Sequence, residues 1–342
     1  MQSQSQATPR AALLNANAPI FRGVISPNDA PVRQALIKRI QAKLETKLIV
    51  YTANPNHPVP GIMIHDVPLF EDLLRSVAQS TKGCLMINSP GGDANAAEKL
   101  LMMCRRRFTD EFDVIVPDYA KSAATMIALG SDRIMMGYLA ELGPIDPQLQ
   151  TSPIPGGEII PARSFIDGLD MIRKKVKVDG DPVQMYLPML SQIRPEVLAI
   201  CQRAIDDARA FAEKWLKNYM LRKDHKQAEA VAEMLSTGAA YKSHGKVIDF
   251  SEAQNVLKLN VEKIDEKSEL WSDIWELYCR SLQQLRQSRA AAKLFESESV
   301  SLTMSIQLVQ TPRQAPPSVP APRPTAPAPG PSVATPPPSS EA

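Results

Sequence analysis

The fold is decided by the stretch Asp118-Tyr-Ala-Lys-Ser-Ala-Ala-Thr-Met-Ile-Ala-Leu-Gly130. An apolar run, Phe112 to Val116, precedes it and is typical of a buried strand, and the stretch itself predicts a short apolar helix that ends at Gly130. We therefore expect Ser122 on the turn between strand and helix, among unpaired backbone N–H groups and at the positive end of the helix dipole. A serine in this place is most often a simple helix N-cap, but the same setting also stabilises the oxyanion of an acyl-transfer reaction.

A second strand–turn–helix unit lies upstream, in Gly83-Cys-Leu-Met-Ile-Asn-Ser-Pro-Gly-Gly-Asp93. Its strand ends in two glycines, Gly91 and Gly92, which allow positive φ and let backbone N–H groups turn toward a ligand. Asp93 is predicted to cap the helix that follows. One unit offers backbone donors and the other a serine, with the N–H of Ala123 as a further donor, so the two together are consistent with an acyl-transfer site.

Four ordered motifs connect the sequence to a known family: Ser89-Pro-Gly-Gly92, Ala120-Lys-Ser-Ala-Ala-Thr125, Ile127-Ala-Leu-Gly130 and Glu141-Leu-Gly-Pro-Ile-Asp-Pro-Gln148. In these motifs the sequence resembles the serine dehydrogenase proteinase family, over residues 45–262. That family belongs to the ClpP/crotonase-like superfamily and is related to the signal peptide peptidase A type of serine peptidase. The resemblance implies an α/β fold built as a spiral of ββα units, Ser122 as the nucleophile, and Gly91 and Gly92 in the oxyanion hole.

The general base is less evident from the sequence. Many relatives use a serine–lysine dyad and others a Ser-His-Asp triad, but the segment where the ClpP branch carries its histidine holds Asp146 here and no histidine. The helix predicted from Pro161 has an apolar stripe formed by Phe165, Leu169, Ile172 and Val176. Lys175 borders this stripe, and partial burial would lower the pKa of its amine.

The sequence therefore favours Lys175, and less strongly Lys174, as the base that deprotonates Ser122. Asp146 and His244 are candidates for supporting roles, and His244 faces the site or only braces a turn. Lys121 is next to Ser122, but neighbours on a helix point away from each other, which makes it a poor base.

Composition limits the function further. The net charge of +2 gives no electrostatic reason to expect nucleic acid. The four cysteines are widely spaced and match no metal-binding pattern, so we expect reduced thiols. No GxGxxG fingerprint for a dinucleotide is present, and neither a cofactor nor a metal is expected. The expected partners are a peptide or protein substrate and, by the resemblance, further copies of the chain.

The chain divides into four predicted segments. Residues 1–30 are expected to be flexible, 31–262 to form the peptidase domain, and 263–310 to form a C-terminal helix and strand. Residues 311–342 hold 12 of the 30 prolines and are expected to form a disordered tail.

The long C-terminal helix is predicted over Ile264–Ala292 and a single strand over Phe295–Val309, while Asp66 is expected to cap an earlier helix. No basic start followed by an apolar segment and no run of ~20 apolar residues is present, so the sequence predicts a soluble, cytoplasmic protein without a transmembrane anchor.

Three classes of function remain after the sequence is read. The leading one is a serine peptidase that forms an acyl-enzyme on Ser122. The second is a scaffold or assembly protein that keeps the fold without catalysis. The third is acyl-CoA chemistry on the crotonase form of the fold, for which the sequence shows neither an adenine nor a pantetheine signature.

Overall fold

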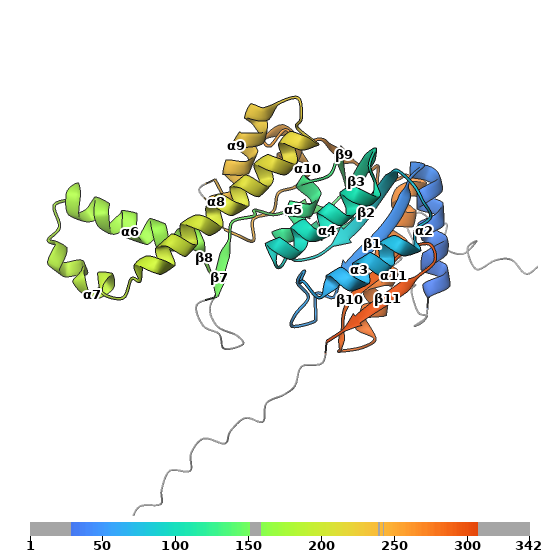
Figure 1. Cartoon of the computed structure of the whole chain (residues 1–342), viewed down its shortest axis with the longest axis horizontal. Coiled ribbons are helices and arrows are strands. Elements are labelled where there is room, and N and C mark those ends of the chain that lie inside the picture. Colours follow the sequence, from blue (N-terminus) through green and yellow to red (C-terminus); the bar gives the residue numbers. More distant parts are fainter. Residues whose placement is uncertain (1–28, 151–158, 239, 242, 307–342) are drawn as a thin grey trace, which may run out of the picture. The chain divides into compact units, whose positions relative to one another are not determined.

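The computed structural model describes residues 29–150, 159–238, 240–241 and 243–306. Its centre is a seven-stranded sheet with the order β11-β10-β1-β2-β3-β5-β9. Five neighbouring strands pair in parallel, and two further strands, joined by antiparallel pairings, form one edge (Figure 1). The strands paired in parallel are β1 (Lys47–Ala53), β2 (Lys82–Asn88), β3 (Glu111–Val116), β5 (Arg133–Met136) and β9 (Val261–Lys263), and the two at the edge are β10 (Ala291–Glu296) and β11 (Ser301–Ser305). The α/β fold class expected from the sequence is confirmed.

Helices cover both faces of the sheet, because strands buried on two sides need an apolar layer on each. One face packs against α2 (Ala30–Leu44) and α11 (Glu269–Arg286). The other face carries α3 (Asp66–Ser76), α4 (Ala94–Arg107) and α5 (Ala123–Leu129). The expected strand before Ser122 and the short helix after it are both present, and Asp93 caps α4 by accepting from the N–H of Ala96.

A second group of helices follows α5 in the chain. They are α6 (Ala162–Lys177), η2 (Val183–Tyr186), α7 (Leu187–Leu190), α8 (Pro195–Asn218), α9 (His225–Ser236) and α10 (Phe250–Asn255), with β7 (Gln148–Gln150) and β8 (Ile159–Pro161) before α6. Phe211 and Trp215 of α8 are buried in the main core, so this face of α8 is a core face. In the part of the chain that the structure describes, no helix is long and apolar enough to cross a bilayer.

The C-terminal segment differs from the single predicted strand. Two strands, β10 and β11, replace it, because the chain reverses at Ser297–Val300. The hydroxyl of Ser297 accepts from the N–H groups of Ser299 and Val300 and so stabilises the turn. β10 pairs with β1, which supplies the partner that the sequence did not reveal and makes the segment after residue 262 part of the main sheet.

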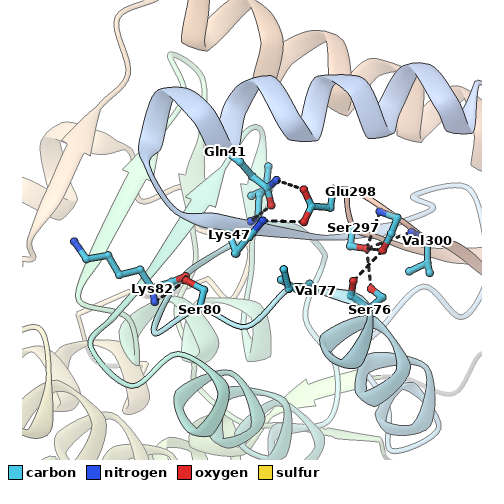
Figure 2. A network of polar contacts seen from close by, with 12 residues as sticks. Gln41, Lys47, Ser76, Val77, Ser80, Lys82, Ser297, Glu298 and Val300 are labelled. Atoms are coloured by element: carbon cyan, nitrogen blue, oxygen red, sulfur yellow. Dashed lines mark hydrogen bonds and ion pairs between the residues drawn. The ribbon is translucent and has the colours of Figure 1, made fainter.

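Polar side chains hold this turn against the rest of the fold, as Figure 2 shows. The carboxylate of Glu298 accepts from Gln41 and from Lys47, each at 2.8 Å. The hydroxyls of Ser297 and Ser76 lie 2.7 Å apart, which ties the turn to the end of α3. The β10–β11 hairpin is therefore anchored to α2, β1 and α3 together.

The expectation that Asp66 caps α3 is wrong. Asp66 is the first residue of the helix, its side chain is fully buried, and no side-chain cap forms there. Its carboxylate instead accepts hydrogen bonds from Tyr51 of β1 and Lys293 of β10.

Candidate active site

Ser122 lies on a strained turn between β4 (Tyr119–Ala120) and α5, at the N-cap position of the helix. Its φ of 49° and ψ of −117° belong to a region that residues with a Cβ rarely occupy, at a cost of about 1–3 kcal/mol. Among the described residues its hydroxyl has no hydrogen-bond partner and caps nothing. A strained serine that stabilises no local structure differs from an ordinary N-cap, and a sharp strand-to-helix turn is a known way to expose a nucleophile.

The two glycines of the upstream turn have the positive φ angles that the sequence predicts, 105° for Gly91 and 143° for Gly92. Gly91 packs directly on the serine, since a Cβ there would lie 2.7 Å from the Cβ of Ser122. Gly92 packs on the backbone of Ile62, whose N and O atoms would lie 2.4 and 2.3 Å from a Cβ. Both positions therefore require glycine for close approach as well as for conformation.

The backbone donors near Ser122 are not equivalent. The N–H of Gly91 donates to the hydroxyl of Ser89 at 3.2 Å. The N–H groups of Gly92 and Ala123 have no acceptor within the described part of the chain, and both residues line the same cleft as Ser122. Of the three expected oxyanion-hole residues, Gly92 and Ala123 thus have available donors, while Gly91 allows the turn to approach the serine.

A series of short backbone pairings joins the turns of the site. Ile62 pairs with Gly92, Ser89 with Ala120, and Leu142 with Ile248. Between them, β4 pairs with β6 (Glu141–Leu142). Segments that lie far apart in the sequence are thereby held beside Ser122, including the segment that contains Asp146 and the segment that contains His244.

Lys121 strengthens this arrangement and does not act on Ser122. Its ammonium donates to the carbonyl oxygens of Leu142 at 3.0 Å and Lys246 at 3.2 Å, and lies 3.0 Å from the carboxylate of Glu141. These contacts occupy the three donors of a lysine ammonium. Lys121 therefore holds together the segments that carry Asp146 and His244.

Asp146 and His244 form a hydrogen-bonded pair across 98 residues of sequence, with 2.7 Å between Oδ1 and Nδ1. Asp146 is buried and its second oxygen accepts from Gln148 at 2.9 Å, whereas the His244 side chain is 28% exposed. An ionised carboxylate can only accept, so Nδ1 carries the hydrogen and Nε2 remains available to take a proton. This geometry matches a histidine oriented by a carboxylate.

A cleft of about 800 Å³ opens in front of Ser122. Its walls come from the first turns of α4, from α8 and from the segment that contains Asp146. Ser122, Gly92, Ala123 and Asp146 all line it, so four of the eight residues singled out in the sequence share one cavity.

The two lysines favoured as the base lie elsewhere. Lys174 and Lys175 are exposed on α6, whose apolar stripe faces a separate groove formed with α7 and the start of α8. Lys175 pairs with Asp179 at 3.0 Å, and this hydrogen bond raises the pKa of its amine. The expected lowering of that pKa is wrong. The apolar stripe was identified from the sequence of one helix, which does not reveal the element against which the stripe packs.

The sequence indicated Asp146 and His244 as two separate candidates for supporting roles and did not predict that they pair. The signal available was the Ser243-His-Gly turn downstream and the proline-flanked Asp146 upstream. Nothing in the spacing of the two residues connects them, since the contact depends on the pairing of Leu142 with Ile248.

A family model described as ClpP-like SDH-type serine proteinase matches residues 30–292 of the chain. Two uncharacterised proteins of Methanocaldococcus jannaschii are similar to it. One is 41% identical over 88 residues, which is 25% of this chain and 30% of that protein. The other is 28% identical over 132 residues, 35% of this chain and 44% of that protein. The chain therefore spans less than half the length of the curated relatives it matches.

Two solved structures are also similar, both of the 1510-N membrane-bound stomatin-specific protease. One is a serine-to-alanine mutant, with 17% identity and a TM-score of 0.38, covering 64% of this chain and 81% of that one. The other is a lysine-to-alanine mutant in complex with a substrate peptide, with 18% identity and a TM-score of 0.38, covering 64% of this chain and 76% of that one.

Proposed function

Because the chain belongs to the family of ClpP-like SDH-type serine proteinases, we propose that it is a serine peptidase that forms an acyl-enzyme on Ser122. The observation that carries this proposal is the strained Ser122, whose hydroxyl has no hydrogen-bond partner among the described residues and which shares one cleft with the backbone donors of Gly92 and Ala123. A φ of 49° combined with a ψ of −117° is costly at a residue other than glycine, and backbone strain of this kind is concentrated at functional sites.

In the proposed reaction the Oγ of Ser122 attacks the carbonyl carbon of a peptide bond while His244 takes the hydroxyl proton. The carbonyl oxygen becomes an oxyanion that accepts from the N–H groups of Gly92 and Ala123. The C–N bond then breaks, and the leaving amine takes the proton from His244. Water then attacks the carbonyl carbon of the ester while His244 takes one of its protons. The bond between that carbon and Oγ breaks, the carboxylic acid product leaves, and His244 returns the proton to the Oγ of Ser122.

Asp146 supports His244 in this scheme by holding the hydrogen on Nδ1 and stabilising the imidazolium. The contact from Nε2 to the serine has to form as substrate enters, as is common for catalytic hydrogen bonds. Lys174 and Lys175 take no part, because Lys175 is charged, exposed and paired with Asp179.

A matched set of variants tests the base. We expect His244→Ala and Asp146→Asn to slow labelling of Ser122 by a fluorophosphonate probe at least 100-fold, since general base catalysis contributes about 10²–10⁴-fold. Lys174→Ala and Lys175→Ala should label at the wild-type rate. Loss of labelling in Lys175→Ala with retention in His244→Ala would instead restore the serine–lysine dyad. A wild-type protein that neither labels nor hydrolyses casein would favour the scaffold function.

The proposed peptidase also assembles with further copies of itself. Eight of the 15 exposed large apolar side chains of the described residues lie between residues 159 and 200, in the stretch from β8 to the first turns of α8. Such a concentration is unusual for a surface that stays in water. We expect light scattering to give a mass above one chain of 37.6 kDa, and replacing Met185 and Met189 with Glu to reduce that mass. A monomeric wild type would contradict the assembly.

A further inference from the structure

A buried ion pair lies outside the cleft, between Lys293 of β10 and Asp66 of α3. Both side chains are 0% exposed, and Nζ lies 2.6 Å from Oδ1. Burial lowers the pKa of Lys293, and the contact with Asp66 acts in the opposite direction. A pair of this kind is expensive to bury and is weak evidence for stability, so a role other than stability should be sought.

The other oxygen of Asp66, Oδ2, is connected by hydrogen bonds to the glycine turn of the active site. Oδ2 accepts from the backbone N–H of Met63 at 3.0 Å and from the hydroxyl of Tyr51 at 2.9 Å. Met63 directly follows Ile62, whose backbone N–H and carbonyl groups both form hydrogen bonds with the glycine turn. The N–H of Ile62 donates to Gly91 at 2.6 Å, and its carbonyl oxygen accepts from Asp93 at 2.8 Å.

An unbroken chain of contacts therefore runs from Lys293 through Asp66, Met63 and Ile62 to the turn that presents the N–H of Gly92. Three donors converge on one buried carboxylate. The ammonium of Lys293 donates to Oδ1 and so fixes the orientation of the carboxylate whose Oδ2 accepts from the Met63 N–H.

We propose that Lys293 is a positioning residue for the oxyanion hole, acting through Asp66 on the backbone of residues 62 and 63. This proposal rests on the proposed function, because it assumes that the N–H of Gly92 stabilises the oxyanion. The hairpin that carries Lys293 is suited to the task, since its turn is anchored by the contacts of Glu298 and Ser297 (Figure 2). β10 thereby couples the C-terminal hairpin to the geometry of the site.

The same strand provides a matched control. Glu296, three residues after Lys293 and so on the opposite face of β10, is 0% exposed and pairs with Arg33 of α2 at 2.9 Å. Both pairs are buried and both hold β10, but the described contacts of Arg33, to Glu296, Gln284 and Ser301, do not lead to the glycine turn. Disruption of either pair should destabilise the strand, and only disruption of the Lys293 pair should affect the oxyanion hole.

The experiment compares Lys293→Met with Arg33→Met in the full chain, with saturation kinetics of fluorophosphonate labelling at a temperature well below both melting transitions. For Lys293→Met we expect the limiting labelling rate to fall by about 10- to 100-fold with the half-saturating concentration unchanged, because a small misplacement of a catalytic group is enough for such a loss. For Arg33→Met we expect a comparable fall in Tm and a labelling rate within about twofold of wild type. Equal losses in both variants, or no loss in Lys293→Met, would overturn the proposal.

A double variant separates positioning from stability if Lys293→Met folds poorly. Replacing both partners, as Lys293→Met with Asp66→Leu, removes both charges and should recover much of the Tm. It also removes the acceptor for Met63, so the labelling rate should stay low, and a restored rate would refute the positioning role.

If Ser122→Ala still hydrolyses substrate, the proposed function itself fails. If Ser122→Ala is inactive and the Lys293 variants label normally, only the positioning role fails.

Discussion

Ser122→Ala should reduce hydrolysis by about 10⁴–10⁶-fold and leave the fold intact, which is the size of loss expected when a nucleophile is removed from a catalytic unit. The hydroxyl has no hydrogen-bond partner among the described residues, so its loss leaves no buried group unsatisfied. Alanine also keeps the strain, because its Cβ meets the same constraint at a φ of 49°. Casein hydrolysis and thermal unfolding, measured side by side, test both parts.

Ser122→Gly is the informative companion. It removes the same hydroxyl but relieves the strain, so we expect it to be as inactive as Ser122→Ala and about 1 kcal/mol more stable. Activity at the wild-type level in either variant would remove Ser122 from the mechanism. Equal stability of the two variants would mean that the strain at this turn is not stored at the serine.

Gly92→Ala should have the second largest effect, on stability and activity together. The new Cβ would lie 2.3 Å from the carbonyl oxygen of Ile62, and the alanine would have to adopt a φ of 143°. Since the obstacle is backbone, it cannot move aside as a side chain could. We expect a loss of about 2–4 kcal/mol in the free energy of unfolding and a fall in kcat of about 10²–10³-fold, the usual cost of losing one oxyanion donor. Chemical denaturation and peptide hydrolysis provide the two measurements.

Gly168→Ala is the matched control for that variant. Gly168 lies within α6, and a Cβ there would meet nothing within 4 Å. Alanine should therefore raise the free energy of unfolding by about 0.5–1 kcal/mol and leave hydrolysis unchanged. A Gly92→Ala protein that is as stable and active as Gly168→Ala would contradict the assignment of the glycine turn to the oxyanion hole.

The sequence by itself determined the local parts of the site. The strand, the turn at Ser122 and the apolar helix of α5 follow from residues that are contiguous in the chain. The positive φ angles at Gly91 and Gly92 follow from the residue type, because only glycine adopts them without cost. Family motifs added the expectation of a ClpP-like fold, and the family match extends to residue 292, past the predicted domain end at 262.

The tertiary structure alone decided which charged groups meet. Asp146 contacts His244, which lies 98 residues away in the sequence, and Lys293 contacts Asp66, which lies 227 residues away. Both contacts depend on strand pairings that no short-range pattern encodes. The sequence did not predict β10 for the same reason. Lys293 and Glu296 are charged, so the segment does not resemble a fully buried strand unless the partners of the two side chains are known. Lys175 shows the converse, because its helix carries the expected apolar stripe but turns it toward α7 and α8. Periodicity reports which side of an element is apolar, whereas the pKa and the role of a charged group depend on the element packed against that side.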